Sequence, residues 1–242
     1  MNATGRVAGS RTILLEFWDI FRRSPLTFIW LAILLATTIT QHSLSPNDLD
    51  RVLGARSTNI HHLTSDPLHV LWTSLFWVDG SRWLPYLVMF MVFHVPAERW
   101  LGSLRWLVVG FSAHIAATYI SEGILALAIR DGVAKTSMVN TLDVGVSYFL
   151  AAITAILTYR IAYPWRWLYL AGVLVVYGYP LFTNLNFTVV GHFTAVLIGL
   201  AWYPITVSRT TSLWNPLDTV RAVGIWLRPA NRRARRAAHT GG

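Results

Sequence analysis

The sequence predicts an all-α polytopic membrane protein, a bundle of six transmembrane helices with a first outer loop that dips into the membrane. Composition gives the first indication. The chain is 54% hydrophobic and 13% charged, with a mean hydropathy of +0.47, whereas soluble domains carry about 25% charged residues. The second indication is that apolar stretches alternate with charged or turn-forming residues, as in successive spans.

The six spans are expected in one membrane domain, residues 25–207. Their predicted ranges are 25–41, 83–97, 106–121, 143–159, 167–182 and 188–207. Several are shorter than the ~20 residues that a perpendicular helix needs. We therefore expect flanking residues, tilt or local thinning of the bilayer to make up the difference.

Two flanking segments are not expected to span. Residues 1–24 form a cytoplasmic N-terminal segment, in which residues 12–21 predict an interfacial amphipathic helix ending in Arg22 and Arg23. Residues 208–242 form a basic cytoplasmic tail, partly disordered, that ends in NRRARRAAHTGG. Its arginines suit anionic lipid headgroups, although a plain topology determinant explains them equally well. The first span is interpreted as a retained anchor, not a cleaved signal peptide.

Charge distribution predicts the orientation. Six spans put both termini on one side, and if that side is the cytoplasm, 15 of the 20 Lys and Arg residues lie inside. The other five are Arg51, Arg56, Arg82, Arg130 and Lys135. We expect a multi-pass protein in the plasma membrane of a bacterium, with both termini cytoplasmic. The net charge of +9 then reflects cytoplasmic loops and anionic lipid, and no nucleic-acid partner is predicted.

The outer loop between the first two spans covers residues 41–82. Its second half, DPLHVLWTSLFWVDG, is apolar and rich in Trp but is interrupted by Pro67 and Gly80. A segment this short cannot span, so we expect it to dip into the outer leaflet. The chain has no cysteine, which excludes disulfides and thiolate chemistry. No histidine or aspartate spacing predicts a metal site, and no cofactor is expected.

Two polar residues inside the spans are candidates for chemistry. Ser147 and His192 each lie a few residues into spans that run in the same direction, so they are expected at similar depth. A serine hydroxyl is a weak nucleophile until a base such as imidazole accepts its proton. Ser147 and His192 are therefore the minimum set for acyl transfer, although a lone serine also satisfies its hydroxyl on its own helix.

Small residues surround this pair. Gly191, Ala195 and Gly199 recur every four residues and form a narrow stripe, which predicts close approach of another helix. Gly145 is expected to do the same on the fourth span. Asp143 is interpreted first as the cap of that span, with capping-box spacing from Asn140. An ion pair with Arg82 or a contact with His192 are the alternatives.

The arrangement resembles that of rhomboid intramembrane serine proteases. Gly145, Ser147 and Tyr148 align with the family's Gly-x-Ser-Gly, and the stripe beginning GH at Gly191 and His192 is similar to its Ala-His-x-x-Gly-x-x-x-Gly. A third stretch, FHVPAERWLGSLRW, resembles the family's Glu-Arg-x-x-Gly-Ser turn. These three short motifs and the Trp-rich loop resemble the family's elements, each on the corresponding span or loop, over residues 25–207.

Departures from the family pattern concern the oxyanion site. The family's His-x-x-x-Asn in the second span falls on Arg82 and Tyr86, which are both hydrogen-bond donors of different reach. The glycine after the serine is replaced by Tyr148, next to the nucleophile. The aromatic residue that packs on the family's catalytic histidine is replaced by Ala151.

Two functions therefore remain open. The resemblance implies an intramembrane serine protease in which Ser147 and His192 form a catalytic dyad, with Arg82 or Tyr86 as oxyanion donors. The departures imply instead an inactive homologue that binds transmembrane partners and guides their assembly or turnover. Asn184 and Asn186 precede the sixth span and are candidates for substrate contact. The sequence leaves the oligomeric state open.

Overall fold

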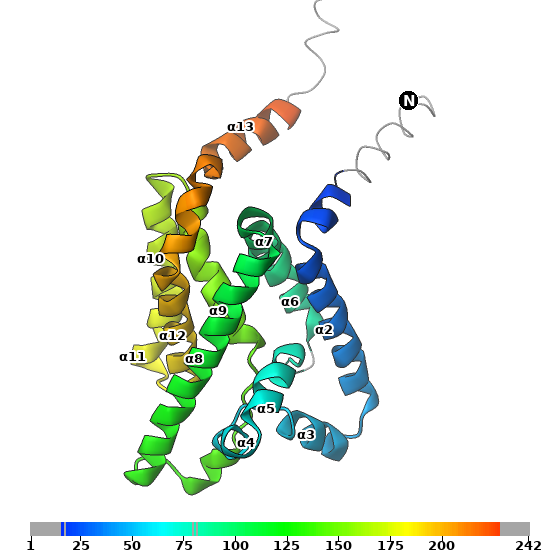
Figure 1. Cartoon of the computed structure of the whole chain (residues 1–242), viewed down its shortest axis with the longest axis vertical. Helices are drawn as coiled ribbons and strands as arrows, with labels where there is room; N and C mark the ends of the chain where they lie inside the picture. Colours follow the sequence, from blue (N-terminus) through cyan, green and yellow to red (C-terminus); the bar gives the residue numbers. More distant parts are fainter. Residues whose placement is uncertain (1–15, 17, 79, 81, 228–242) are drawn as a thin grey trace, which may run out of the picture.

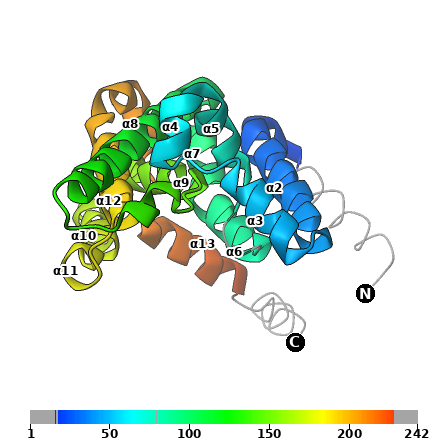
Figure 2. The ribbon, with the colours of Figure 1, turned by 90° about the horizontal axis from the view of Figure 1, so that it is seen from below.

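Helix α9 (Val146–Ile156) lies at the centre of the bundle, with the other long helices packed around it (Figures 1 and 2). The computed structural model describes residues 16, 18–78, 80 and 82–227. Every residue of α9 is buried except Ser147 and Leu150. A helix enclosed by protein does not have to match the thickness of the bilayer, because neighbouring segments cover its ends. The enclosure by other helices therefore explains why α9, with 11 residues, is shorter than a helix that spans the bilayer alone.

The two long peripheral helices are long and apolar enough to cross a membrane. They are α2 (Pro25–Ser43) and α8 (Ser103–Arg130), with 19 and 28 residues. A third span is formed if α12 (Phe187–Ala201) and the following 3₁₀ segment η6 (Tyr203–Ser212) are taken together across a 44° bend. These elements match the first, third and sixth predicted spans, and the all-helical class is confirmed.

The second and fifth predicted spans are interrupted helices. In the second, α6 (Trp83–Met89) passes through a π-helical turn, η3 (Phe90–His94), into α7 (Val95–Leu101). The turn widens where Pro96, which has no N–H, cannot donate to the carbonyl of Val92. In the fifth, α10 (Trp165–Gly178) is followed by α11 (Pro180–Thr183). The count of six spans stays a prediction.

Helix α8 extends beyond the third predicted span, 106–121, at both ends. Helix α8 continues for nine residues to Arg130, so Glu122 and Gly123 do not break it. The residues that follow them are mostly Ala, Leu and Ile, which favour continuation of the helix. It ends at Asp131, before Gly132 with its φ of +74°. Much of the predicted loop between the third and fourth spans is therefore helix.

Short helices gather at one end of the bundle, which we call the loop end (Figure 1). They are α3 (Pro46–Gly54), α4 (Ile60–Ser65), α5 (Pro67–Thr73) and the 3₁₀ turn η1 (Ser74–Phe76). The first three begin after the capping side chains of Ser45, Asn59 and Asp66. Leu68 and Trp72 are 82% and 57% exposed on this segment. Such apolar exposure suits contact with lipid, and the membrane dip stays a prediction.

The opposite end, the terminal end, holds both ends of the described chain and α13 (Pro216–Leu227). The segment before α13 is pinned to the turn after α9, η5 (Leu157–Arg160). The amide of Trp214 donates to the carbonyl oxygen of Arg160 at 2.8 Å, and the amide of Ala162 donates to that of Trp214 at 2.9 Å. Most of the predicted amphipathic helix, and the arginines from Arg228 onward, lie outside the described residues.

Aromatic rings fill the core where α2, α8 and α9 meet. The indole of Trp30 lies edge-on to Phe90, Trp106 and Phe149, with ring centroids 5.5, 5.8 and 4.6 Å away. Its Nε1–H donates to the carbonyl oxygen of Leu75 at 2.9 Å, which satisfies the polar end of the ring. This cluster joins the first helix to the central one.

A buried carboxylate caps α2. The side chain of Glu98, on α7, is fully buried and accepts the amides of Leu26 and Thr27 at 3.1 and 2.8 Å. It also accepts the hydroxyls of Thr27 at 2.7 Å and Ser103 at 2.6 Å. Between Glu98 and Ser103 the chain turns at Gly102, whose φ of +86° favours glycine. The Glu-Arg-x-x-Gly-Ser stretch is thus a structural joint between α2, α7 and α8.

We predict that Glu98→Ala lowers the free energy of unfolding by about 3 kcal/mol, because it leaves buried N–H groups of α2 without an acceptor. Thermal unfolding in detergent micelles measures the change. Asp50→Ala removes an exposed carboxylate as the control and is expected to change stability by less than ~0.5 kcal/mol. Equal shifts for both variants would contradict the assigned role of Glu98.

Candidate functional site

Helices α9 and α12 pack against each other through the predicted glycine stripe. A Cβ atom placed on Gly199 would collide with the backbone carbonyl of Ala152, and one on Gly191 would lie 2.6 Å from the hydroxyl of Tyr148. Ala195, between the two glycines, is fully buried. The stripe therefore brings the backbones of α9 and α12 together, as the sequence predicts.

Ser147 and His192 border the same side of this helix pair, near its loop end. Ser147 and Thr154 are seven residues apart, about two turns, and so share a face of α9. At Thr154 the helix meets α10, because the hydroxyl of Tyr169 donates to the backbone carbonyl oxygen of Thr154 at 2.8 Å. The ring of His192 lies 6.2 Å from that of Tyr177, also on α10.

Within the described residues, the Ser147 hydroxyl and the His192 imidazole form no hydrogen bond with each other. The side chain of Ser147 is half-buried, as is that of His192. A serine is activated as a nucleophile when a base within hydrogen-bond reach accepts its proton. In the described part of the chain, the two groups therefore do not form a hydrogen-bonded dyad.

Tyr148 is turned away from Ser147 and fills the space between α8, α9 and α12. Its side chain is fully buried, and its ring meets that of His192 in a T-shaped contact at 5.1 Å. The ring of His114 lies 6.5 Å away on the other side. The Tyr148 hydroxyl lies close to Asp143 and Ser121 without a well-formed hydrogen bond to either. Tyr148 thus supplies the aromatic contact with His192 that Ala151 cannot make.

Asp143 does not cap α9, contrary to the first interpretation. Helix α9 begins after Gly145 without a side-chain cap, and Asp143 lies two residues before that glycine. Its backbone N–H donates to the hydroxyl of Ser57 at 2.8 Å, and its carbonyl oxygen accepts the amide of Thr58 at 3.0 Å. The Thr58 hydroxyl also lies 3.2 Å from the carboxylate. Long-range partners displaced the local cap, and the described residues include no ion pair between Asp143 and Arg82.

The imidazole of His114, on α8, packs against the glycine that precedes α9. A Cβ atom on Gly145 would collide with the His114 imidazole, so this glycine admits a side-chain ring and not the backbone of another helix. The Nε2 atom of His114 lies 2.9 Å from the carbonyl oxygen of Leu71 in the loop. Ser57, Thr58 and His114 thus hold the segment in front of Ser147. Sequence reasoning missed these partners, because no local spacing relates them to the fourth span.

The predicted oxyanion donors lie at the start of α6. Arg82 is the exposed residue before this helix, and its side chain caps none of the helix amides. Tyr86, one turn later, is half-buried and packs against the core. No hydrogen bond joins Ser147 to Arg82 or Tyr86 in the described part of the chain. Their role as oxyanion donors stays a prediction.

The two asparagines lie exposed at the loop end of α12. Asn186 caps this helix, since its side-chain oxygen accepts the amide of Val189 at 2.9 Å. Its side-chain N–H group donates to the carbonyl oxygen of Asn184 at 3.3 Å. Asn186 therefore has a structural role that accounts for its residue type, and substrate contact by either residue stays a prediction.

A groove of about 230 Å³ opens beside His192. It is lined by Val176, Tyr177, Pro180, Val189 and His192, which belong to α10, α11 and α12. Ser147 does not line it. The apolar surface next to the groove includes Tyr179 and Phe182, which are 64% and 89% exposed. The groove thus offers one imidazole within an apolar surface that faces outward from the bundle.

We predict that Gly199→Ala lowers the free energy of unfolding by about 2 kcal/mol, because the added methyl group forces α9 and α12 apart. Gly172→Ala is the matched control on α10, where an added Cβ has no atom within 4 Å. It is expected to be neutral or stabilising by up to ~1 kcal/mol through helix propensity. Chemical unfolding in micelles compares the two, and similar losses for both would refute tight α9–α12 packing.

Comparison with protein families adds one finding. A family model described as "Rhomboid-like protein" matches residues 19–212, which includes every element from α2 to η6. Comparisons with curated proteins and with solved structures gave no match.

Proposed function

Because the chain belongs to the rhomboid-like protein family, we propose that it binds transmembrane segments of other membrane proteins without cleaving them. It is an integral membrane protein, as its family and its apolar helices indicate. We further propose the plasma membrane of a bacterium and a cytoplasmic terminal end. In that orientation, 15 of the 20 Lys and Arg residues lie on the cytoplasmic side and five on the outer side. Such an excess of positive charge inside supports the proposed orientation.

The observation that carries the proposal is the missing hydrogen bond between Ser147 and His192. Without it, no base is in place to accept the serine proton. The substitutions in the sequence act in the same direction, since Arg82 and Tyr86 stand where the family pattern has histidine and asparagine. The loss of one oxyanion donor alone costs about 10²–10³ in rate.

The groove beside His192 supports binding. Its walls are apolar except for the imidazole and the Tyr177 hydroxyl, and it lies between helices that face outward. The side chains of a partner helix can pack there, and a polar side chain or an unwound carbonyl of that helix can accept a hydrogen bond from His192. Interhelical contacts of this kind associate helices within a bilayer.

A serine protease is the second candidate, and one observation favours it. Ser147 and His192 lie near the loop-end starts of α9 and α12, two helices that pack closely against each other. Ser147 would then attack a peptide carbonyl while His192 accepts its proton and later passes it to the leaving amine. The Ser147 amide, with Arg82 or Tyr86, would donate to the oxyanion.

We predict that the protein, purified in detergent, reacts with a fluorophosphonate probe no faster than Ser147→Ala. The reason is that an unactivated hydroxyl reacts slowly with such electrophiles. In-gel fluorescence measures the labelling, with an active rhomboid protease as the positive control. Labelling that disappears in both Ser147→Ala and His192→Ala would establish a working dyad and overturn the non-catalytic proposal.

We predict that Ser147→Ala retains membrane-protein partners as well as the natural protein does. Affinity purification from crosslinked membranes, with quantitative mass spectrometry, measures their recovery. Val176→Trp fills the groove from its exposed side and is expected to reduce recovery at least fivefold. Val108→Trp adds the same ring at an exposed position of α8 and is the control. Equal recovery with Val176→Trp and the natural protein would contradict binding at the groove.

A further inference from the structure

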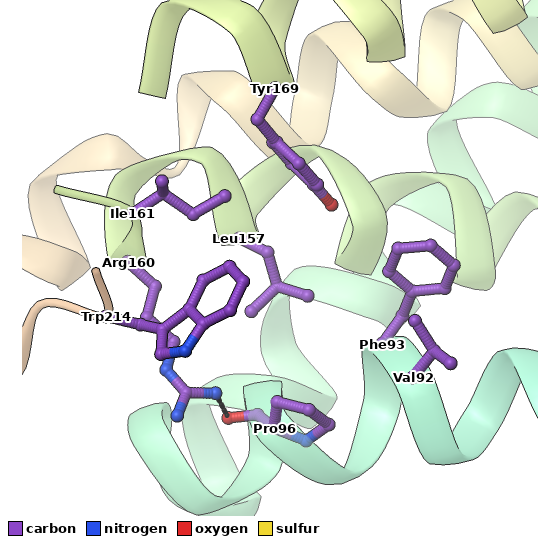
Figure 3. Close-up of a pocket in the computed structure, with 8 residues that line it drawn as sticks. All are labelled: Val92, Phe93, Pro96, Leu157, Arg160, Ile161, Tyr169 and Trp214. Carbon is purple, nitrogen blue, oxygen red and sulfur yellow. Dashed lines mark hydrogen bonds between the residues drawn. The ribbon is translucent and has the colours of Figure 1, made fainter. Parts of the chain in front are cut away.

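A second pocket lies at the terminal end, away from the candidate site (Figure 3). Its volume is about 360 Å³, within the ~300–1,000 Å³ typical of ligand sites. It lies between the second-span segment η3–α7, the end of α9 and the start of α10. Its lining residues are Val92, Phe93, Pro96, Leu157, Arg160, Ile161, Tyr169 and Trp214.

The pocket is apolar along most of its wall and reaches the surface. Figure 3 shows Phe93, Leu157 and Tyr169 around one part of it and the Trp214 indole beside the Arg160 side chain at the other. Val92 and Trp214 are 53% and 44% exposed, so the space opens between them. In an integral membrane protein, an apolar opening between outward-facing helices meets lipid chains.

One cationic group lies in this apolar wall. The NH1 group of Arg160 donates to the carbonyl oxygen of Pro96 at 2.8 Å, but its Nε–H is buried and has no acceptor. No acidic side chain pairs with Arg160 among the described residues, and the positive charge of Arg99 acts on it as well. A buried guanidinium N–H left without an acceptor is costly, so an anionic oxygen fits there.

We propose that this pocket binds one anionic phospholipid, with an acyl chain among Phe93, Leu157 and Tyr169 and the phosphate at Arg160. The apolar wall favours a lipid over a free phosphate ion. The uncompensated charge favours an anionic headgroup over a zwitterionic one, as in other basic pockets between membrane helices. This site is separate from the groove at His192 and does not depend on the proposed function.

The test uses the full chain, stripped of lipid in an uncharged detergent. Native mass spectrometry counts bound lipid during titration with phosphatidylglycerol, phosphatidylcholine of the same chain length, or inorganic phosphate. We expect one phosphatidylglycerol to bind at least fivefold more tightly than phosphatidylcholine, and no effect of phosphate. Equal affinity for the two lipids, or displacement of phosphatidylglycerol by phosphate, overturns the proposal.

Two matched variants test whether the lipid headgroup binds at Arg160. Arg160→Gln keeps an N–H donor for Pro96 but removes the charge, and is expected to abolish the preference for phosphatidylglycerol. Arg105→Gln makes the same change near the same end, outside the pocket lining, and is expected to preserve it. Equal losses in both variants overturn the assignment to this pocket.

A change at Val92 tests the apolar part without altering Arg160. Val92→Trp fills the exposed mouth and is expected to weaken phosphatidylglycerol binding at least fivefold, so unchanged affinity overturns the proposal. A photo-crosslinking amino acid at Val92 then identifies the occupant in native membranes. A lipid adduct supports the proposal, whereas an adduct to another protein or to a second copy of the chain overturns it.

Discussion

The enclosure of α9 is the constraint on which the rest of the structure depends. Its outer neighbours approach it so closely that Gly145, Gly191 and Gly199 leave no room for a Cβ atom. Close packing of this kind replaces the hydrophobic effect as the source of helix association in a bilayer, where lipid chains are as apolar as the helices. The central helix can then be short, and the segment that leads into it can be non-helical, because surrounding protein covers the ends of the helix and this segment.

That enclosure also decides how the candidate residues lie. Two adjacent residues of a helix point about 100° apart, so Tyr148 and Ser147 project in different directions from α9. The glycine at position 191 admits the Tyr148 ring, which occupies the contact with His192. Ser147 is half-buried and forms no hydrogen bond with His192 in the described part of the chain. Tyr148, the residue after the serine, thus occupies the space beside His192.

Local patterns in the sequence were sufficient for the helical class, for the Gly191–Gly199 stripe and for three of the apolar spans. They were insufficient at Asp143, where an Asn140–Asp143 spacing predicted a cap. The hydroxyls that bind Asp143 belong to Ser57 and Thr58, more than 80 residues away in the chain. They were also insufficient for the length of α8, which extends to Arg130, nine residues beyond the third predicted span. The side chain of Glu122 lies on the buried side of α8, and the helix continues through it.

The carboxylate of Glu98 has a consequence for the way in which the protein is made. The first amides of α2 find their acceptor on a residue more than 70 positions later in the chain. During synthesis α2 therefore leaves the ribosome with its starting amides unsatisfied, and they depend on water or lipid headgroups until α7 arrives. Insertion of the first helix therefore precedes completion of its cap, and the same carboxylate then joins α2 to α7 and, through Ser103, to α8.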